Sequence, residues 1–404
     1  MKHIVILGDG MADLPSLELD NLTPLEKAHT PNMDRLTKLG QAGLFHTVPE
    51  SLHPGSEVAN MAVMGYDVEN LYEGRGVLEA ASIGVTLASD DLAFRCNLIT
   101  LEDGIIHNHS AGHIGNEEAG VLIDFLNDHL ADERVAFHKG VSYRHLMVIK
   151  GGDKHIHCTP PHDVPGADEV DHLPKTLKEA VASKETAALV TDLIKRSQEL
   201  LASHPINLER KAKGKATAAS IWPWSPGYKP QMPTLKEAYN IQKSAVISAV
   251  DLIHGIGIYA GMEVIKVDGA TGLWDTNYVG KRDAAIKALE TCDYVYLHIE
   301  APDEAGHEGD AKIKIKAIED IDEKVVGPIL EFALEQKDIA IALLPDHPTP
   351  WELKTHTRDA VPFAIYHPHN PSDSVAHYAE KDAAQGAYGE VEKMEFMKLL
   401  LNQQ

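Results

Sequence analysis

The chain has few cysteines, no long apolar run and a deficit of positive charge. Its three cysteines, Cys96, Cys158 and Cys292, are an odd number at unrelated spacings, which argues against a disulfide framework. No apolar segment approaches the roughly 18 residues that a membrane span requires. The amino terminus shows no signal peptide, because its apolar stretch is limited to Ile4–Leu7. The sequence therefore predicts a reduced, cytoplasmic protein with no membrane partner.

The shortage of positive charge excludes a second class of partner. Lysine and arginine total 37 residues against 61 aspartates and glutamates, which gives a formal charge of −24 over 404 residues. Such a surface repels nucleic acid. A small anionic substrate can still bind, provided that a metal ion or arginines reverse the field locally. The hydrophobic content of 44% and charged content of 24% are those of a globular protein with two or three domains.

Short apolar runs alternate with helical patterns at both ends of the chain. The runs that predict buried strands are Ile4–Leu7, Tyr294–Ile299, Ile339–Leu344 and Val361–Tyr366. Helical spacing covers residues 283–291 and 312–336, between these runs. This alternation predicts an α/β fold with a mainly parallel sheet and helices on both faces.

Two further helices are predicted near the amino terminus. Thr30 is placed to cap one of them, with Pro31 in its first turn, Met33, Leu36 and Leu39 on its inner face, and Gly40 at its end. The second begins at Ser56, after the turn Pro54-Gly55.

The middle of the chain has a different character. Amphipathic helices are expected over 116–129 and 177–202, followed by the proline-rich stretch Ile221–Pro233. We interpret residues 86–239 as a smaller α/β domain inserted into a discontinuous one made of 1–85 and 240–404.

Three aspartates follow three of the predicted strands: Asp9, Asp303 and Asp346. In an open α/β sheet the functional site lies outside the carboxyl ends of the strands, so these side chains are expected to converge. Any one of them alone would read as a loop residue or a helix cap. The three together predict a site.

Three of the 23 histidines accompany these aspartates. His307 lies four residues after Asp303, His347 directly follows Asp346, and His356 comes shortly afterwards. Carboxylate oxygen and imidazole nitrogen suit Zn²⁺ or Mn²⁺. A set of this size can build two adjacent metal sites, the arrangement that clamps a phosphoryl group during displacement.

A phosphoryl clamp needs a nucleophile, and Ser56 is the best candidate. At a helix start, backbone amides and the helix dipole favour a developing alkoxide and a bound phosphate. An ordinary helix-capping serine is the alternative from local sequence alone.

The motifs in combination resemble the alkaline phosphatase superfamily, and within it the archaeal-type cofactor-independent phosphoglycerate mutases. The resemblance covers essentially the whole chain. It rests on Gly8-Asp9-Gly10, the Thr30–Leu36 segment, Pro54–Asn60, Ala301–His307 and Pro345–His347, with further matches at Gly74–Gly76, Leu78–Ser82, Phe94–Asn97, Ser110–His113, Trp222–Trp224 and Gly269–Gly272.

The resemblance implies a role for each matching residue. One metal ion would be held by Asp303, His307 and His356, and the other by Asp9, Ser56, Asp346 and His347. Ser56 would be phosphorylated transiently, and the substrate would be a small phosphorylated hydroxy acid. The implied reaction interconverts 3-phosphoglycerate and 2-phosphoglycerate without 2,3-bisphosphoglycerate. The two ions would be Mn²⁺ or Zn²⁺, with Co²⁺ and Mg²⁺ as further candidates.

The inserted domain is expected to orient the substrate. Arg75, Arg95, His113 and Arg144 are the candidates for its phosphate and carboxylate, because arginine offers a bidentate fork to both groups. The family leads us to expect a glycine near Ser225, and the role of the Trp222–Trp224 loop stays open. The basic run from Arg210 to Lys215 is expected to be a solvated loop.

Other functions remain open at this point. The same metals and serine would serve a homoserine kinase with another acceptor pocket, or a phosphomonoester hydrolase. A metal-dependent binding protein would have no use for the serine. The sequence does not determine the oligomeric state.

Overall fold

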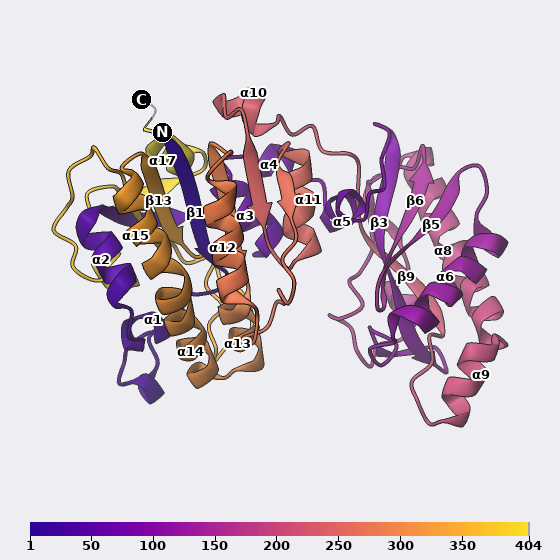
Figure 1. The fold of residues 1–404 in the computed structure, drawn as a ribbon. Coiled ribbons are helices and arrows are strands. Elements are labelled where there is room, and N and C mark those ends of the chain that lie inside the picture. Colours follow the sequence, from indigo (N-terminus) through magenta and orange to yellow (C-terminus); the bar gives the residue numbers. More distant parts are fainter. Residues whose placement is uncertain (403–404) are drawn as a thin grey trace. The chain divides into compact units, whose positions relative to one another are not determined.

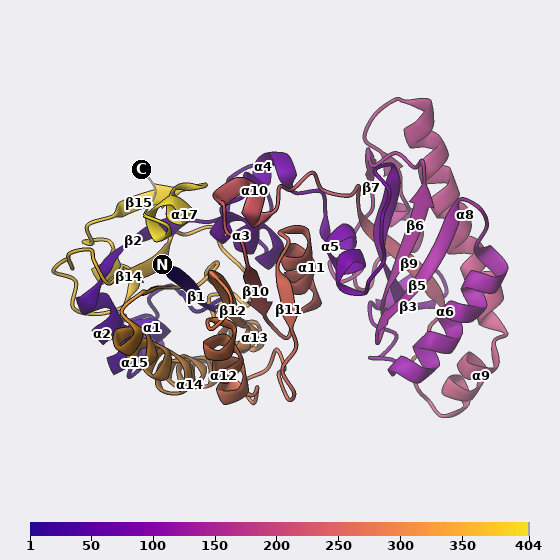
Figure 2. The same ribbon diagram turned by 45° about the horizontal axis from the view of Figure 1, so that its top comes forward.

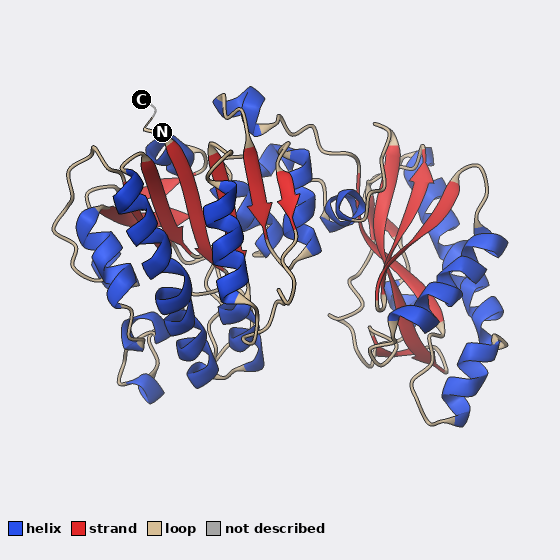
Figure 3. Ribbon diagram, viewed as in Figure 1, coloured by secondary structure: helices blue, strands red, loops and turns tan. Residues whose placement is uncertain are grey.

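The first apolar run of the sequence forms a central strand in the computed structural model, which describes residues 1–402. This strand, β1 (Lys2–Gly8), pairs in parallel with β12 (Tyr294–Ile299) on one side and β13 (Ile339–Leu344) on the other. Every residue of β12 and β13 is buried. A parallel sheet covered on both faces requires such strands, which explains why these segments are continuous apolar runs in the sequence. Figures 1 and 3 show the sheet among its helices.

Within the described chain, the sheet has eight strands in the order β11-β10-β12-β1-β13-β14-β2-β15. The remaining strands are β11 (Glu263–Ile265), β10 (Ser244–Ile247), β14 (Val361–Tyr366), β2 (Gln41–His46) and β15 (Gly389–Glu392). Strand β14 runs antiparallel to both of its neighbours, and the other pairs are parallel. The prediction of a mainly parallel sheet is confirmed.

Helices cover both faces of this sheet, as Figure 2 shows. One face carries α1 (Pro24–Lys27), α2 (Pro31–Leu39), α12 (Tyr278–Ala288), α14 (Ala311–Ile321) and α15 (Gly327–Gln336). The other carries α3 (Ser56–Val63), α4 (Val68–Leu71), α10 (Leu235–Tyr239), α11 (Asp251–Tyr259) and α17 (Glu395–Leu400). The remaining helical elements of this unit are η1 (Leu17–Leu19), α13 (Ala301–Glu308) and α16 (Glu380–Ala383). The helix predicted over 312–336 consists of α14 and α15 joined by the π-helical turn η2 (Asp322–Val326).

The start of α2 is capped from a distance rather than locally. Thr30 is the N-cap residue, but its side chain makes no capping hydrogen bond within the described chain. Asp322 instead accepts hydrogen bonds from the backbone amides of Asn32 and Met33, at 3.0 and 2.7 Å, and from the Asn32 side chain at 2.8 Å. The prediction that Leu39 faces inward is wrong: it is 37% exposed, because it lies off the buried stripe of Met33, Leu36 and Thr37.

A second compact unit, Glu73–Gln231, has its own sheet and its own hydrophobic core. Its sheet is antiparallel, with the order β4-β3-β6-β5, and β9 also pairs with β3. Its strands are β3 (Asp91–Glu102), β4 (Ile105–Asn108), β5 (Val135–Val141), β6 (Arg144–Lys150) and β9 (Ser220–Gly227), with the small pair β7 (Ile156–His157) and β8 (Lys175–Thr176) apart. Helices α6 (Asn116–Leu130) and α8 (Val181–Ala202) pack together against this sheet, and α5 (Arg75–Ser82) packs against β3 and β9. Helices α7 (Glu169–His172) and α9 (Pro205–Ala212) complete the unit.

The first unit comprises residues 1–72 and the described residues from Met232 onward. The sequence boundaries of 85/86 and 239/240 thus differ from the divisions at 72/73 and 231/232, because α5 packs on the sheet of the second unit. Among residues 1–402, no helix combines the length and the apolar character needed to cross a membrane.

The remote cap of α2 generates a stability prediction. Replacing Asp322 by Ala leaves buried amides without acceptors, and we expect the free energy of unfolding to fall by about 2 kcal/mol. Thr30→Ala is the matched control, since its hydroxyl caps nothing, and should cost less. Chemical denaturation followed by circular dichroism measures both. Equal losses in the two variants would show that Asp322 is not the cap.

Candidate active site

The three predicted aspartates meet at the carboxyl ends of three neighbouring strands. Asp9 follows β1, Asp346 follows β13, and Asp303 lies in the first turn of α13, directly after β12. All three are buried. The intervening Gly10 adopts a φ of 62°, and a Cβ there would approach the Asp303 Cα to 2.7 Å. The Gly-Asp-Gly motif is therefore required by the close approach of Asp303 to the first loop.

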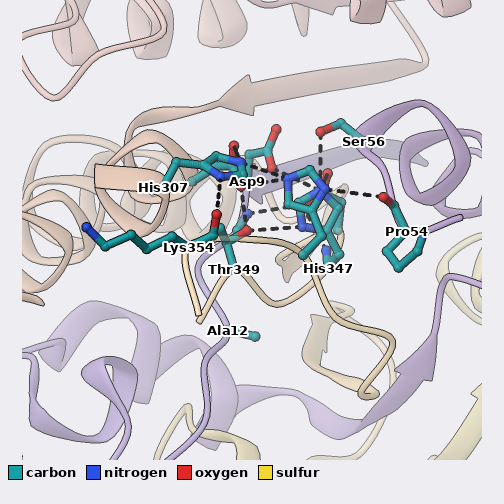
Figure 4. Close-up of polar contacts among 12 residues, drawn as sticks. Asp9, Ala12, Pro54, Ser56, His307, His347, Thr349 and Lys354 are labelled. Atoms are coloured by element: carbon teal, nitrogen blue, oxygen red, sulfur yellow. Dashed lines mark hydrogen bonds and ion pairs between the residues drawn. The ribbon is translucent and has the colours of Figure 1, made fainter. Parts of the chain in front are cut away.

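Each of the three predicted histidines approaches the aspartates through its Nε2 atom, and Figure 4 shows His307 and His347 in this cluster. The Nε2 atoms of His307 and His356 are 2.9 Å apart and lie 3.3 and 3.4 Å from Asp303 oxygens. The Nε2 atom of His347 lies 3.4 Å from Asp346 and 3.6 Å from Asp9.

The Nδ1 atom of each ring faces away from the cluster and meets an oxygen. The partners are the Lys354 carbonyl for His307, at 3.1 Å, the Thr349 hydroxyl for His347, at 3.3 Å, and the Pro54 carbonyl for His356, at 3.4 Å. A second contact of this kind orients an imidazole and fixes the tautomer in which Nε2 can serve as a ligand.

Ser56 completes the cluster. Its Oγ lies 3.2 Å from His347 Nε2, and its backbone is the first residue of α3, with Gly55 as the N-cap. The structure thus brings together all seven residues that the sequence predicted as metal ligands, drawn from four separate segments. The serine also lies where the free amides of a helix start can face an anion.

The donor set fits divalent cations. Ligand atoms lie within 4.8 Å of one another in two overlapping groups, Asp303 with His347 and His356, and Asp9 with Asp346 and His347. Asp9 Oδ1 is buried and has no hydrogen-bond partner among the described residues. A mixture of carboxylate and imidazole ligands suits Zn²⁺ or Mn²⁺, and an unpartnered buried carboxylate oxygen is the atom that a cation would satisfy.

Electrostatics supports the same interpretation. Burial, together with the charges of Asp346 and Asp303, raises the pKa of Asp9 well above its usual value. Burial would also raise the pKa of Asp303, but hydrogen bonds from His307 and His356 outweigh it and hold that pKa well below the usual range. His307 shows the reciprocal effect, because Asp303 overcomes burial and raises its pKa to about 9. Three carboxylates in one buried place therefore depend on positive charge.

Two polar side chains that sequence reasoning missed orient the aspartates. His298 Nε2 lies 2.9 Å from Asp9 Oδ2, and Asn60 donates to Asp346 Oδ2 at 2.8 Å. Asn60 itself is held by the Tyr296 hydroxyl at 2.6 Å. Its spacing of four residues from Ser56, on the same face of α3, is a local signal that could have identified it.

Lys314, which sequence reasoning also missed, links the loop that follows Asp9 to the loop that follows His347. Its side chain is fully buried and donates to the Ala12 and Thr349 carbonyls, at 3.1 and 2.8 Å, and to Asp13 at 2.6 Å. The Thr349 hydroxyl in turn donates to Asp303. The sequence offers no signal for Lys314, because it lies within a run of alternating lysines and isoleucines that reads as an amphipathic helix.

The predicted substrate residues gather in the second unit. Arg95 is buried, pairs with Glu79 at 3.1 Å and stacks on Trp224 at 5.0 Å. Burial lowers the pKa of Arg95, as do the nearby charges of Arg75 and Arg144. Arg144 and His113 are exposed, and both lie near Tyr143. The Arg144 guanidinium is 5.4 Å from the centre of the Tyr143 ring, and the His113 ring is 6.2 Å from it.

Two further histidines belong to this basic cluster. His109 lies 5.7 Å from Tyr143 and 6.1 Å from His162, and His162 lies 5.1 Å from Trp224. Ser225, where the family predicts a nearby glycine, has a φ of 51° and accepts a hydrogen bond from the Arg75 amide at 3.0 Å. The turn retains the left-handed backbone that would favour glycine.

Comparison with known proteins identifies relatives along the whole chain. The family model described as 2,3-bisphosphoglycerate-independent phosphoglycerate mutase matches residues 37–207. A mutase of that name from Methanosarcina mazei is 49% identical over 404 residues, covering 99% of this chain and 100% of the relative. A probable mutase of the same name from Geobacter sulfurreducens is 46% identical and is covered completely, as is this chain.

A solved structure agrees with these relatives. The cofactor-independent phosphoglycerate mutase from Thermoplasma acidophilum is 26% identical, covers 100% of this chain with 99% of its own, and superposes with a TM-score of 0.69. The site geometry and the full-length relatives lead to the same conclusion. The chain belongs to the family of 2,3-bisphosphoglycerate-independent phosphoglycerate mutases.

Proposed function

We propose that this chain interconverts 3-phosphoglycerate and 2-phosphoglycerate through a phosphorylated Ser56, without 2,3-bisphosphoglycerate. The observation that carries the proposal is the position of the Ser56 hydroxyl, 3.2 Å from His347 Nε2 at the first residue of α3. A helix cap at that place would need no cluster of buried carboxylates and imidazoles beside it. A nucleophile for phosphoryl transfer needs both.

We assign two cation sites to the seven clustered residues. Asp303, His307 and His356 would hold one ion, and Asp9, Ser56, Asp346 and His347 the other, with Mn²⁺ or Zn²⁺ as the first candidates and Co²⁺ or Mg²⁺ as alternatives. Bound ions would lower the pKa of the Ser56 hydroxyl and neutralise the charge on the phosphoryl oxygens.

The protein groups would then act in two symmetrical steps. The Ser56 oxygen forms a bond to phosphorus while the bond from phosphorus to the glycerate oxygen breaks, and the serine proton ends on the released hydroxyl. The amides at the start of α3 face the phosphoryl group throughout. In the second step the other hydroxyl of the same glycerate attacks, and the proton returns to Ser56. Most of the catalysis is positioning and charge neutralisation.

The basic cluster of the second unit is proposed to hold the glycerate between the two steps. Arg75, Arg95, His113 and Arg144 supply the forks and donors that a carboxylate and a phosphate require. Exclusion of water from the phosphoserine would prevent its hydrolysis. The cysteines of the described chain are unpaired and buried, and on this ground we place the enzyme in the reducing cytoplasm, where it would serve glycolysis.

The cation assignment predicts the result of chelation. Metal-free protein should lose its mutase activity and regain it with Mn²⁺, Zn²⁺ or Co²⁺. Asp303→Ala combined with His307→Ala should lose metal from one site, measured as metal content per chain by mass spectrometry. Asp34→Ala with His377→Ala is the matched control, because this carboxylate–imidazole pair, 2.9 Å apart, lies outside the cluster. Full metal content in the Asp303 and His307 double variant would refute the assignment.

The nucleophile assignment predicts a catalytic loss without a folding loss. Ser56→Ala should lower turnover by roughly 10⁴-fold or more, since no phosphoenzyme can form. Its unfolding free energy should change by less than about 1 kcal/mol, because Gly55 rather than Ser56 is the N-cap. Rapid quench with labelled substrate followed by peptide mapping should find phosphate on Ser56, with Ser51→Ala as an exposed control. Label on a histidine would contradict the mechanism.

Retention of glycerate predicts how label is distributed. With unlabelled 3-phosphoglycerate and ¹⁴C-glycerate, the 2-phosphoglycerate formed should contain little ¹⁴C, phosphate release should be far slower than isomerisation, and ATP should not be needed. Arg144→Ala should raise the ratio of hydrolysis to isomerisation if Arg144 grips the carboxylate. Arg196→Ala, an exposed arginine paired with Asp192, is the control.

Three outcomes would redirect the proposal. Phosphate release without isomerisation would identify a hydrolase. ATP-dependent phosphorylation of homoserine without isomerisation would identify a kinase with the same metal site. An unchanged ratio in Arg144→Ala would remove that residue from the substrate site.

A further inference from the structure

The turn that presents His113 is built in an unfavourable backbone conformation. Ala111, Gly112 and His113 have φ angles of 47°, 62° and 53°, so three successive residues are left-handed. Two of them carry a Cβ, and each such residue pays a steric penalty in this region. A turn of this kind persists only when the surrounding structure holds it in place.

The amide groups of the turn are held from within the same loop. The side chain of Asn108 accepts hydrogen bonds from the amides of Ser110 and Gly112, both at 2.9 Å. The Ser110 hydroxyl accepts one from the His113 amide at 3.2 Å. These contacts leave the carbonyl of Ala111 to be satisfied from elsewhere.

Arg210 supplies that contact from α9. Its Nη2 donates to the Ala111 carbonyl at 2.8 Å, its Nε donates to the Ala216 carbonyl at 2.7 Å, and its Nη1 pairs with Glu118 at 2.5 Å. The residue is 4% exposed. The expectation of a solvated loop is therefore wrong for Arg210, which is buried in α9, and for Lys211, which is exposed but also lies in α9. Lys213 and Lys215 follow the helix and are exposed, as expected.

The three bonds need the shape of the guanidinium group as well as its charge. They reach three different segments, and a planar fork with five donors can satisfy all of them at once. A lysine has a compact ammonium and would keep the ion pair with Glu118 while losing at least one carbonyl. Ala216 also lies close to the turn itself, since a Cβ on Gly112 would approach the Ala216 Cβ to 2.8 Å.

We propose that Arg210 is a positioning residue that holds the left-handed turn at 111–113 and thereby aims His113 at the substrate. It acts through the Ala111 carbonyl and touches no substrate itself. The inference rests on the proposed function, which gives His113 its role, and it adds the residue that makes this role geometrically possible.

Hydrogen exchange tests the positioning without reference to activity. In Arg210→Met, the Gly112 and His113 amides should exchange at least about tenfold faster than in the parent protein, because their turn loses its anchor. Arg210→Lys should show an intermediate rate. Glu118→Gln keeps both carbonyl bonds and should leave these two amides protected, and Arg196→Met controls for loss of a surface charge in the same unit. Unchanged exchange in Arg210→Met, or equal effects in Glu118→Gln, would overturn the inference.

Kinetics separates positioning from general stability. Arg210→Met should lower kcat/KM for isomerisation at least about tenfold, since small misplacements of a substrate group are costly. Adding Arg210→Met to His113→Ala should lower it little further, because one residue acts through the other. Ala111→Gly should restore part of the loss in Arg210→Met, since glycine adopts the left-handed region without penalty. Additive losses, or no rescue by glycine, would identify Arg210 as a structural ion pair.

Two outcomes distinguish a failure of the role proposed for His113 from a failure of the anchoring by Arg210. If His113→Ala retains full isomerisation activity while the amides of Arg210→Met exchange faster, the role proposed for His113 fails and the anchoring by Arg210 stands. If His113→Ala is impaired and Arg210→Met is not, the inference fails and the proposed function stands.

Discussion

Like-charge repulsion among Asp9, Asp303 and Asp346 is the constraint on which the rest of the site depends. Three buried carboxylates at neighbouring strand ends cannot all ionise unless positive charge or donors surround them. Burial, together with repulsion from Asp346 and Asp303, raises the pKa of Asp9 well above its usual value. The surrounding groups reduce this repulsion. Imidazoles face the cluster, and His298 and Asn60 donate hydrogen bonds to the Oδ2 atoms of Asp9 and Asp346. The fully buried ammonium of Lys314 donates to the Thr349 carbonyl nearby. Asp9 Oδ1 has no hydrogen-bond partner among the described residues, and a bound cation would supply the positive charge that this oxygen lacks.

The order of the strands produces this crowding. Strands β12, β1 and β13 are adjacent and parallel, although β1 lies at the start of the chain and β12 begins only at Tyr294. Their carboxyl ends therefore emerge at one edge, and each adds a loop with an aspartate. Antiparallel β14 then returns the chain across the sheet. The chain beyond β13 reaches the site mainly through the loop before β14, which carries His347 and His356.

Local patterns were enough to find the clustered aspartates and histidines, but not the groups that hold them in place. Asp9 could be found because an aspartate followed a buried strand, and His307 because it lies one helical turn after Asp303. Lys314, His298 and Thr349 act through contacts with residues far away in the sequence, for which no local pattern exists. The cap of α2 shows the same limit, since Thr30 has the right residue type while Asp322, nearly 300 residues later, makes the bonds. Arg210 was misread because its neighbours in the basic run are exposed.

The overall charge gives these local arrangements their significance. A chain of net charge −24 repels a phosphorylated acid from most of its surface. On the proposed function, two places would reverse this field: the carboxylate–imidazole cluster of the first unit once cations are bound, and the group formed by Arg75, Arg95 and Arg144 in the second. Both concentrate like charges at a cost in free energy, which folding alone would not favour. We expect each cost to fall when an ion of opposite sign binds: cations at the carboxylates, and the carboxylate and phosphate of a substrate at the arginines. Binding would then relieve the repulsion that the fold imposes, and on the proposed function specificity for a small polyanion would arise from the same crowding of like charges.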